Sequence, residues 1–168
     1  MHSLTIKNLS QNKSVFEYLL INRSKEEQLY RPHAKKWCLL EIVCHLCDEE
    51  IEDFRTRVLH TLQFPGSMPP PIDPVAWVKT RKYMEQNYDT TVLKFLSERN
   101  KSILLLQELE KPDWKKAYQH PSLGKLTAEH FLFNWLGHDY LHIRQITGLL
   151  FNYTQLKTGN NLNYAGEW

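Results

Sequence analysis

Apolar residues recur every three or four positions along four long segments of this chain, a spacing that places them on one face of a helix. The segments span residues 11–21, 38–62, 89–110 and 127–151. Alternation with a period of two, the sign of a half-buried strand, is visible nowhere in the sequence. We therefore expect an all-α fold, a four-helix bundle whose apolar faces meet in a shared core.

Proline and capping residues set the limits of the predicted helices. The proline-rich residues 64–74 predict a loop, because proline removes backbone donors and breaks helices. Ser24 and Glu27 have the spacing of a capping box that begins a short helical turn. Cys38 and Glu41 occupy the same frame at the start of the second long segment, although cysteine caps a helix less well than serine or threonine.

Further boundaries follow from the second half of the chain. Asp73 precedes Pro74, which is typical of an N-cap followed by proline at the first helical position. The helix that begins there is expected to reach about residue 84, and Asp89 begins the next one. A turn is predicted at residues 119–124, and Thr127 is the expected N-cap of the last helix.

Length and composition are those of an ordinary globular chain. We expect its 168 residues to form one domain, 1–168, since neither side of the proline-rich loop has enough residues for a core of its own. Apolar residues make up 42 % and charged residues 24 %, which argues against disorder. The net charge is +2 and the basic residues form no block, so we expect no binding to nucleic acid.

The sequence also favours a cytoplasmic location. Cys38, Cys44 and Cys47 are an odd number of cysteines in a chain too large to need disulfides, so reduced thiols are expected. The N-terminal residues contain no apolar stretch of signal-peptide length, and no segment approaches the roughly 18 apolar residues of a membrane span. We therefore expect a soluble protein that does not act at a membrane.

His138 and His142 are the most informative residues for function. They are four positions apart in a predicted helix, so their side chains lie one above the other on one face. Two imidazoles placed in this way can bind one metal ion, although the same pair can also be a hydrogen-bonded feature of a helical core. A third histidine, His45, lies on the second predicted helix. If the two helices pack, the three imidazoles can form a site that suits zinc, nickel or ferrous iron.

Two carboxylates accompany His45. Asp48 and Glu49 follow it by three and four positions and so lie on nearly the same helix face. Either carboxylate can orient an imidazole by accepting a hydrogen bond, or can accept a proton from an activated water molecule. The alternative is that both belong to a solvated acidic face.

Other charged residues near these positions have roles outside the candidate site. Glu50 lies about 140° around the helix from His45, so we expect it to pair with Arg55 or Arg57. Asp139 follows a histidine by one residue and therefore points elsewhere, toward a salt bridge or a contact from another direction.

Four more side chains lie close to the histidines in the sequence. Arg144 and Gln145 follow the histidine pair and are candidates for contacting a substrate anion and for a hydrogen bond near the site. Cys44 and Cys47 flank His45 and could bind a soft metal with it, but no second cysteine pair completes a zinc ribbon. Because the neighbouring carboxylates would raise the pKa of a thiol, a nucleophilic cysteine is disfavoured.

Two parts of the chain resemble the DinB-like superfamily. Residues 31–50 read RPHAKKWCLLEIVCHLCDEE, which is similar to that family's pattern RP…kW(S)xxEIxxHLxDxE. Residues 120–127 and 138–146 read HPSLGKLT and HDYLHIRQI, which are similar to the pattern HPxxGxLT…HDxxHxxQI. The order and spacing agree across most of the chain, and the departure is Cys38, where the pattern has serine or threonine.

The resemblance implies an up-down four-helix bundle with a long crossover connection, often a homodimer. It implies a divalent metal bound by His45, His138 and His142, with zinc or nickel as the first candidates and iron or manganese after them. Some members of the family are bacillithiol S-transferases or mycothiol-dependent maleylpyruvate isomerases, and many are assigned only as metal-dependent hydrolases.

The leading hypothesis is a metal-dependent enzyme, either a thiol S-transferase or a hydrolase, that acts on a small molecule. A metal would lower the pKa of water or of a low-molecular-weight thiol and so make a nucleophile near neutral pH. In the hydrolase, Asp48 or Glu49 would accept the proton. The alternative is a non-catalytic helical bundle that binds a metal or a small ligand.

Overall fold

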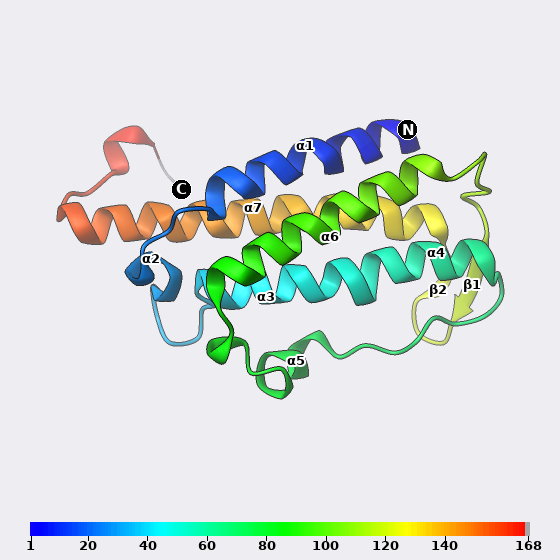
Figure 1. Cartoon of the computed structure of the whole chain (residues 1–168), viewed down its shortest axis with the longest axis horizontal. Coiled ribbons are helices and arrows are strands. Elements are labelled where there is room, and N and C mark those ends of the chain that lie inside the picture. Colours follow the sequence, from blue (N-terminus) through cyan, green and yellow to red (C-terminus); the bar gives the residue numbers. More distant parts are fainter. Residues whose placement is uncertain (167–168) are drawn as a thin grey trace.

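Four long helical rods form the protein, whose computed structural model describes residues 1–166. The rods are α1 (His2–Leu20), a composite rod of α3 (Leu39–Asp48), the π-helix η1 (Glu49–Arg55) and α4 (Thr56–Gln63), α6 (Tyr88–Glu108), and α7 (Ala128–Thr158). They lie side by side along the long axis of the molecule (Figure 1). The expected all-α four-helix bundle is therefore confirmed.

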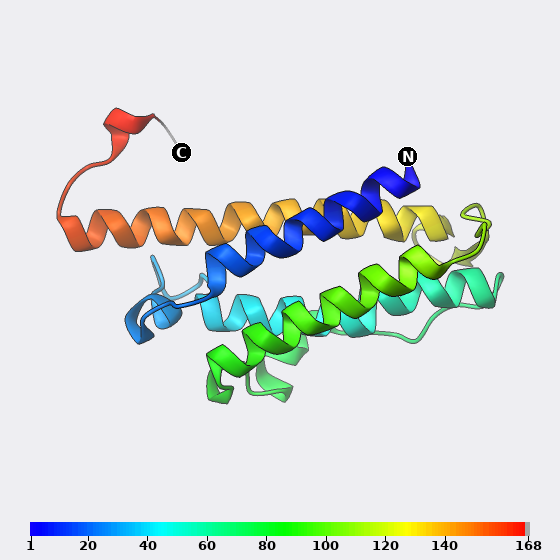
Figure 2. The same ribbon diagram turned by 45° about the horizontal axis from the view of Figure 1, so that its top comes forward.

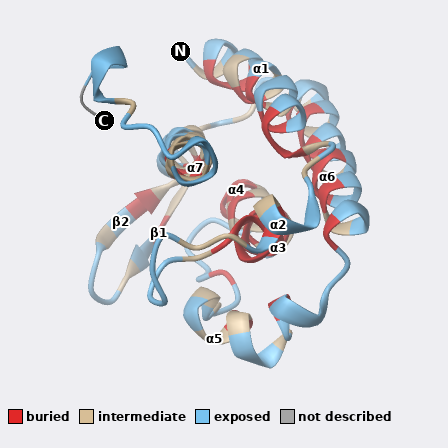
Figure 3. Cartoon of the chain, turned by 90° about the vertical axis from the view of Figure 1, so that its left-hand side faces the viewer, coloured by how far each residue is buried: buried red, intermediate tan, exposed pale blue. Residues whose placement is uncertain are grey.

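A long crossover joins the composite rod to α6. Residues 64–87 carry it along the outside of the bundle and include the short helix α5 (Pro74–Thr80), which Asp73 caps as predicted, and the 3-10 turn η2 (Tyr83–Glu85). Because the crossover returns to the end at which the composite rod begins, α3 and α6 run in the same direction, opposite to α1 and α7 (Figure 1). Around the bundle the order is α1, α6, the composite rod and α7 (Figure 3).

The capping residues at the start of α2 (Lys25–Leu29) and α3 are those that the sequence predicts. Ser24 and Glu27 form the capping box of α2. At α3 the backbone N–H of Cys38 donates to the Glu41 carboxylate across 3.0 Å. In both helices a glutamate of the first turn therefore accepts the backbone N–H of the N-cap residue.

For α7 the capping prediction is confirmed, and for α6 it is wrong. Thr127 accepts a hydrogen bond from the backbone N–H of His130 and caps α7. Helix α6, however, does not begin at Asp89. The Asn87 side chain accepts the backbone N–H of Thr90 across 2.9 Å and is the N-cap instead. Both residues are good N-caps, so the sequence alone does not choose between them.

The first and last helices are longer than predicted. Helix α1 begins at His2 rather than near residue 11, because Ile6 and Leu9 continue its buried face. Helix α7 continues to Thr158, and its last turns extend beyond the bundle (Figure 2). No buried residue of α7 follows Leu149, so apolar periodicity does not mark the extension. Among the described residues no helix, α7 included, is long and apolar enough to cross a membrane.

A small β-hairpin, which the sequence analysis did not predict, precedes α7. Strands β1 (Ala117–His120) and β2 (Gly124–Thr127) pair antiparallel around the predicted turn. Tyr118 lies opposite Leu126, and both side chains are buried at the end of the core. The expectation of no strands is therefore wrong at this point, because strands of four residues are too short to display a period of two.

Buried residues lie on the helix faces that are turned toward the inside of the bundle (Figure 3). They form two hydrophobic clusters. One cluster includes Ile42 of α3 and Ile146 of α7, and the other, at the hairpin end, includes Trp135 of α7. On α7, His138 and His142 lie between the two clusters. The histidines are thus held by a helix whose apolar residues are anchored on either side of them.

Candidate metal centre

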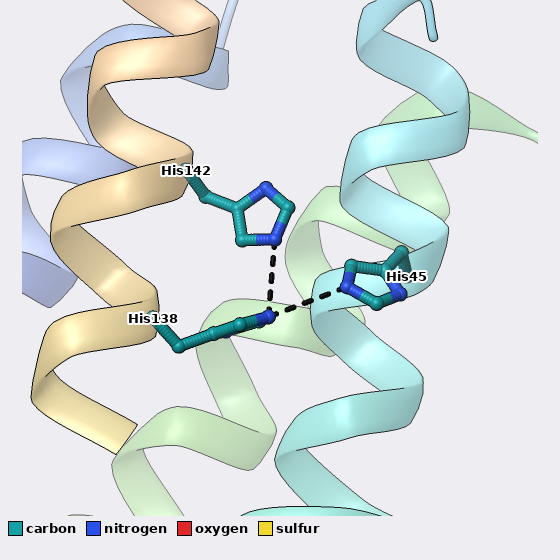
Figure 4. Close-up of side chains that lie close together, drawn as sticks. All are labelled: His45, His138 and His142. Carbon is teal, nitrogen blue, oxygen red and sulfur yellow. Dashed lines mark hydrogen bonds between the residues drawn. The ribbon is translucent and has the colours of Figure 1, made fainter. Parts of the chain in front are cut away.

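Three imidazole rings from two helices meet at one point inside the bundle. His45 comes from α3, and His138 and His142 come from successive turns of α7. The Nε2 atom of His138 lies 3.3 Å from Nε2 of His45 and 3.1 Å from Nε2 of His142 (Figure 4). The structure therefore brings together the three histidines that the sequence analysis selects.

This convergence fits a divalent metal. The Nε2 atom of a neutral His138 carries either one proton or one lone pair, so it can satisfy only one of its two nitrogen contacts by a hydrogen bond. A cation at the centre would instead bind all three lone pairs. Three nitrogen donors that leave further directions open are a set that zinc, nickel and ferrous iron accept. The residues present therefore fit the metal that the family resemblance implies.

Burial keeps the three rings neutral. It lowers the pKa of His45 to about 3, of His138 to about 2 and of His142 to about 4, from the usual 6.5. Loss of contact with water is the main cause in each case. Neighbouring imidazoles add to the effect for His45 and His138, whereas the Gln145 amide acts in the opposite direction on His142. Neutral imidazole is the form that binds a metal, so protons compete little for this site near neutral pH.

Two aromatic side chains account for part of this burial. The Trp37 ring lies 5.0 Å from the His45 ring, measured between centroids. The Phe54 ring lies 5.0 Å from the His138 ring. These apolar walls strengthen electrostatic interactions at the histidines, because they replace water on two sides.

The carboxylate of Glu49 lies behind His45. Its Oε1 atom is 3.9 Å from Nδ1 of His45, and Nδ1 is the ring nitrogen that does not face the other histidines. Burial and a hydrogen bond with Asp53 raise the pKa of Glu49. The two atoms are too far apart for a hydrogen bond. Glu49 could orient the ring only as a carboxylate, the form that a cation bound at Nε2 would favour. Because Glu49 lies on the side of the ring away from the three Nε2 atoms, its placement disfavours the role of proton acceptor.

The carboxylate of Asp48 points to a different part of the molecule. It accepts a hydrogen bond of 2.7 Å from the Tyr83 hydroxyl and pairs with Arg81 across 2.9 Å. These three residues line a pocket of about 380 Å³ whose walls do not include the three histidines. A catalytic role for Asp48 stays a prediction, and this placement does not favour it.

Cys44 and Cys47 line the same pocket as Asp48. Burial raises the pKa of Cys44 to about 12 and the pKa of Cys47 to about 11, with the Asp48 charge adding to both. The thiols therefore remain protonated near neutral pH, which disfavours a nucleophilic role. The cysteines of the described residues are free thiols.

A buried ionic network includes Asp139, the residue that follows His138 on α7. Arg99 of α6 donates two hydrogen bonds of 2.7 Å to Asp139 and one of 2.9 Å to Glu50. Asn12 of α1 donates to Asp139 across 3.1 Å, and the Trp135 indole donates to Glu50 across 3.0 Å.

The predicted pairing of Glu50 with Arg55 or Arg57 is thus wrong, whereas Asp139 does form a salt bridge. The network joins all four rods beside a histidine of the site.

Two features of this region escaped the sequence analysis. Arg99 occupies the buried face of α6 between Leu96 and Ile103, and that position in the apolar repeat is the signal that could have found it. The π-helix Glu49–Arg55 interrupts the rod directly after α3 and turns both Glu49 and Glu50 inward. In a continuous α-helix Glu50 would lie on the side away from His45. The π-helix turns it toward Arg99 instead, and the sequence does not reveal this change of direction.

A crossover-linked four-helix bundle with three inward histidines defines a class of helical proteins built around a candidate metal site. The family model described as the DinB superfamily matches residues 8–146. The chain belongs to the DinB superfamily, as its two motif segments predict. The matched range contains all three histidines.

A solved structure has the same fold. YfiT from Bacillus subtilis matches this chain with a TM-score of 0.78 and 18 % sequence identity, over 95 % of this chain and 89 % of that chain. YfiT is described as a probable metal-dependent hydrolase with an unusual four-helix bundle topology. At this identity the likeness concerns the fold alone. No curated protein is significantly similar to the chain in sequence.

Proposed function

We propose that this protein is a metal-dependent enzyme that holds a divalent metal with His45, His138 and His142. The observation that carries the proposal is the convergence of three Nε2 atoms, with contacts of 3.1 and 3.3 Å, from helices packed in the core. A metal bound there would act as a Lewis acid that lowers the pKa of water or of a thiol. Zinc and nickel are our first candidates, followed by iron and manganese, because histidine nitrogen suits all of them.

The side chains around the histidines have supporting roles in this proposal. Glu49 orients His45 from the Nδ1 side, and the network of Arg99 and Asp139 fixes the turn of α7 that carries His138. Trp37 and Phe54 exclude water from two sides of the site.

Hydrolysis of a small molecule is the reaction that we favour. The support is the description of YfiT, a protein of the same fold, together with the open metal directions that three donors leave. Transfer of a low-molecular-weight thiol to an electrophile uses the same site and is the alternative enzyme activity. A non-catalytic, metal-stabilised bundle is the third outcome that the experiments below distinguish.

Elemental analysis of protein purified without added metal tests the metal site. The unmodified chain should contain about one divalent ion per molecule, and His45→Ala should contain much less. His130→Ala is the matched control, because it removes an exposed histidine from α7 and should leave the metal content unchanged. Equal metal content in His45→Ala and the unmodified protein would contradict the proposal.

Activity assays then test the reaction class. Metal-loaded protein is presented with a panel of esters and amides, and separately with thiol and electrophile pairs. Turnover that is lost in a folded His138→Ala variant supports the enzyme, and the panel that responds identifies the class. Metal binding that raises the melting temperature without turnover in either panel would favour the structural role.

A further inference from the structure

A second pocket lies directly beside the candidate metal centre. It has a volume of about 360 Å³ and lies between the connection before α3 and the second half of α7. Two of its lining residues link it to the histidines. The Trp37 ring lies 5.0 Å from the His45 ring between centroids, and the Gln145 amide is close enough to His142 to raise its pKa. The three histidines do not line this pocket, but these two residues lie between it and the histidines and connect the two.

The charges that line this pocket are all positive. Lys36 and Arg144 are its charged side chains, and no acidic residue lines it. Neither cation forms an ion pair within the part of the chain that the structure describes. The pocket that contains Asp48 differs in this respect, because its two cations, Arg81 and Lys94, are matched by two carboxylates, Asp48 and Glu52. The pocket beside the histidines thus has uncompensated positive charge.

The remaining walls are apolar or carry amides. Trp37, Leu141 and Leu149 supply apolar surface, while Gln145 and Asn152 supply amide groups. Pockets of this size that combine an apolar wall with a few convergent polar groups typically bind small molecules. The combination suits an amphipathic ligand with an anionic end.

We propose that this pocket binds a small-molecule substrate through an anionic head group, a carboxylate or a phosphate. Lys36 and Arg144 contact the anion, and the apolar body of the molecule packs against Trp37 with its reacting bond toward the histidines. This inference rests on the proposed function for the identity of the reacting end, but the selection of an anion depends on the protein's own cations.

The test compares matched probes that differ in charge. NMR titrations on chelated and on zinc-loaded protein use 3-phenylpropionate, its neutral amide, and 2-phenylethylphosphonate, and they follow the Trp37 indole N–H. We expect both anions to bind roughly tenfold more tightly than the amide, and Lys36→Gln or Arg144→Gln to weaken anion binding roughly threefold to fivefold each. Lys94→Gln, which removes a lysine that lines the other pocket, should change nothing.

The outcomes separate this inference from the proposed function. Equal affinity for the amide and the anions, or anion binding that is unaffected by Lys36→Gln and Arg144→Gln, would overturn the anion pocket. If anion preference appears only with zinc present and survives both substitutions, the metal alone binds the anion, and the pocket proposal fails while the metal site stands. If zinc does not bind at all, the proposed function fails, and the chelated protein still decides whether the pocket selects anions.

Discussion

Asp48 and Glu49 are neighbours in the chain, yet their carboxylates meet different parts of the molecule. Asp48 is held by Tyr83 and Arg81, whereas Glu49 lies 3.9 Å from Nδ1 of His45. Groups that orient a metal-binding imidazole contribute to metal affinity although they do not touch the metal. The two carboxylates therefore make a matched pair for testing which of them supports the site.

Glu49→Gln should lower the affinity for zinc by roughly 10- to 100-fold, because the orienting carboxylate behind His45 is lost. Competition with a chromophoric chelator measures the affinity. Asp48→Asn is the control and should bind zinc as the unmodified protein does, since its partners lie away from the histidines. A similar loss of affinity in both variants would show that Glu49 has no special role at His45.

The metal-free protein should lose stability as the pH falls below about 6.5. Burial lowers the pKa of the three histidines in the folded chain, so the unfolded chain binds more protons in mildly acidic solution. As the pH is lowered, the free energy of unfolding therefore decreases by up to about 1.4 kcal/mol per histidine for each pH unit. The raised pKa of Glu49 has the opposite effect, because the folded chain binds that proton more tightly than the unfolded chain does. It is a single group, whereas three histidines act in the first direction.

Urea unfolding of chelated protein at about pH 7 and about pH 5 checks this pH dependence. The same measurement on His138→Phe, which keeps a ring in place of the imidazole, should give a shallower dependence because one titrating group is gone. Stability that is the same at both pH values in the unmodified protein would contradict the assignment of neutral, buried imidazoles.

Individual residues were predictable from the sequence to different degrees. The histidines were selected by their four-residue spacing and by the family motifs, and both signals are local in the chain. Arg99 was not selected, because its partners Asp139 and Glu50 come from other rods and are not local to it. A buried charge is recognised by its distant partners, and the order of residues does not give those distances.

At the scale of elements, the π-helix Glu49–Arg55 determines which side chains meet the core. It lies between α3, which carries His45, and α4, whose apolar face is continuous with the hairpin end of the bundle. The wider i→i+5 turns let Glu49 and Glu50 both point inward, one to His45 and one to Arg99. Segments of this kind are frequent at functional sites, which agrees with its place beside the histidines.

Gly137 weakens helix α7 directly before His138. Gly137 is exposed in the middle of the helix, and a Cβ atom added there would meet nothing within 4 Å. Gly137→Ala should therefore stabilise the protein by up to about 1 kcal/mol, because alanine has the higher helix propensity. Urea unfolding measures the change, with zinc affinity as a second readout that should stay the same. A decrease in stability would mean that a neighbouring group needs the space.

Helix number and approximate position followed from apolar periodicity, since that pattern is set by burial on one face. The ends followed less well, as the start of α1 and the extension of α7 show. The hairpin at residues 117–127 was missed because its strands are short and its burial depends on contact with α4 and α7. Elements defined by tertiary contact leave weak local signals.

At the scale of the whole molecule, the network around Arg99 joins side chains from all four rods: Glu50 of the π-helix, Asp139 of α7 and, through a neutral amide, Asn12 of α1. Arg99 is 1 % exposed and Asp139 is 0 % exposed, so neither charge can be hydrated if its partner is lost. The charges of Glu50 and Asp139 raise the pKa of Arg99 in spite of its burial. Removal of one partner from such a group leaves an uncompensated buried charge.

Arg99→Gln should destabilise the protein by about 3–5 kcal/mol. The matched control is Arg55→Gln, which breaks a partly exposed ion pair with Glu98 and should cost about 1 kcal/mol or less. Thermal or urea unfolding of the chelated proteins compares the two. Equal losses would mean that the ionic network contributes no more than a surface pair.

His138 and Asp139 are consecutive residues, and one faces the histidine cluster while the other is bonded to Arg99. Hydrogen bonds from Arg99 and Asn12 to Asp139 hold the rotation of this turn. If the proposed metal binds, exchange of one cation for another would therefore leave this turn in place. Which ion a cell installs would then depend on the supply of metals in that compartment more than on any ability of the ion to organise the polypeptide.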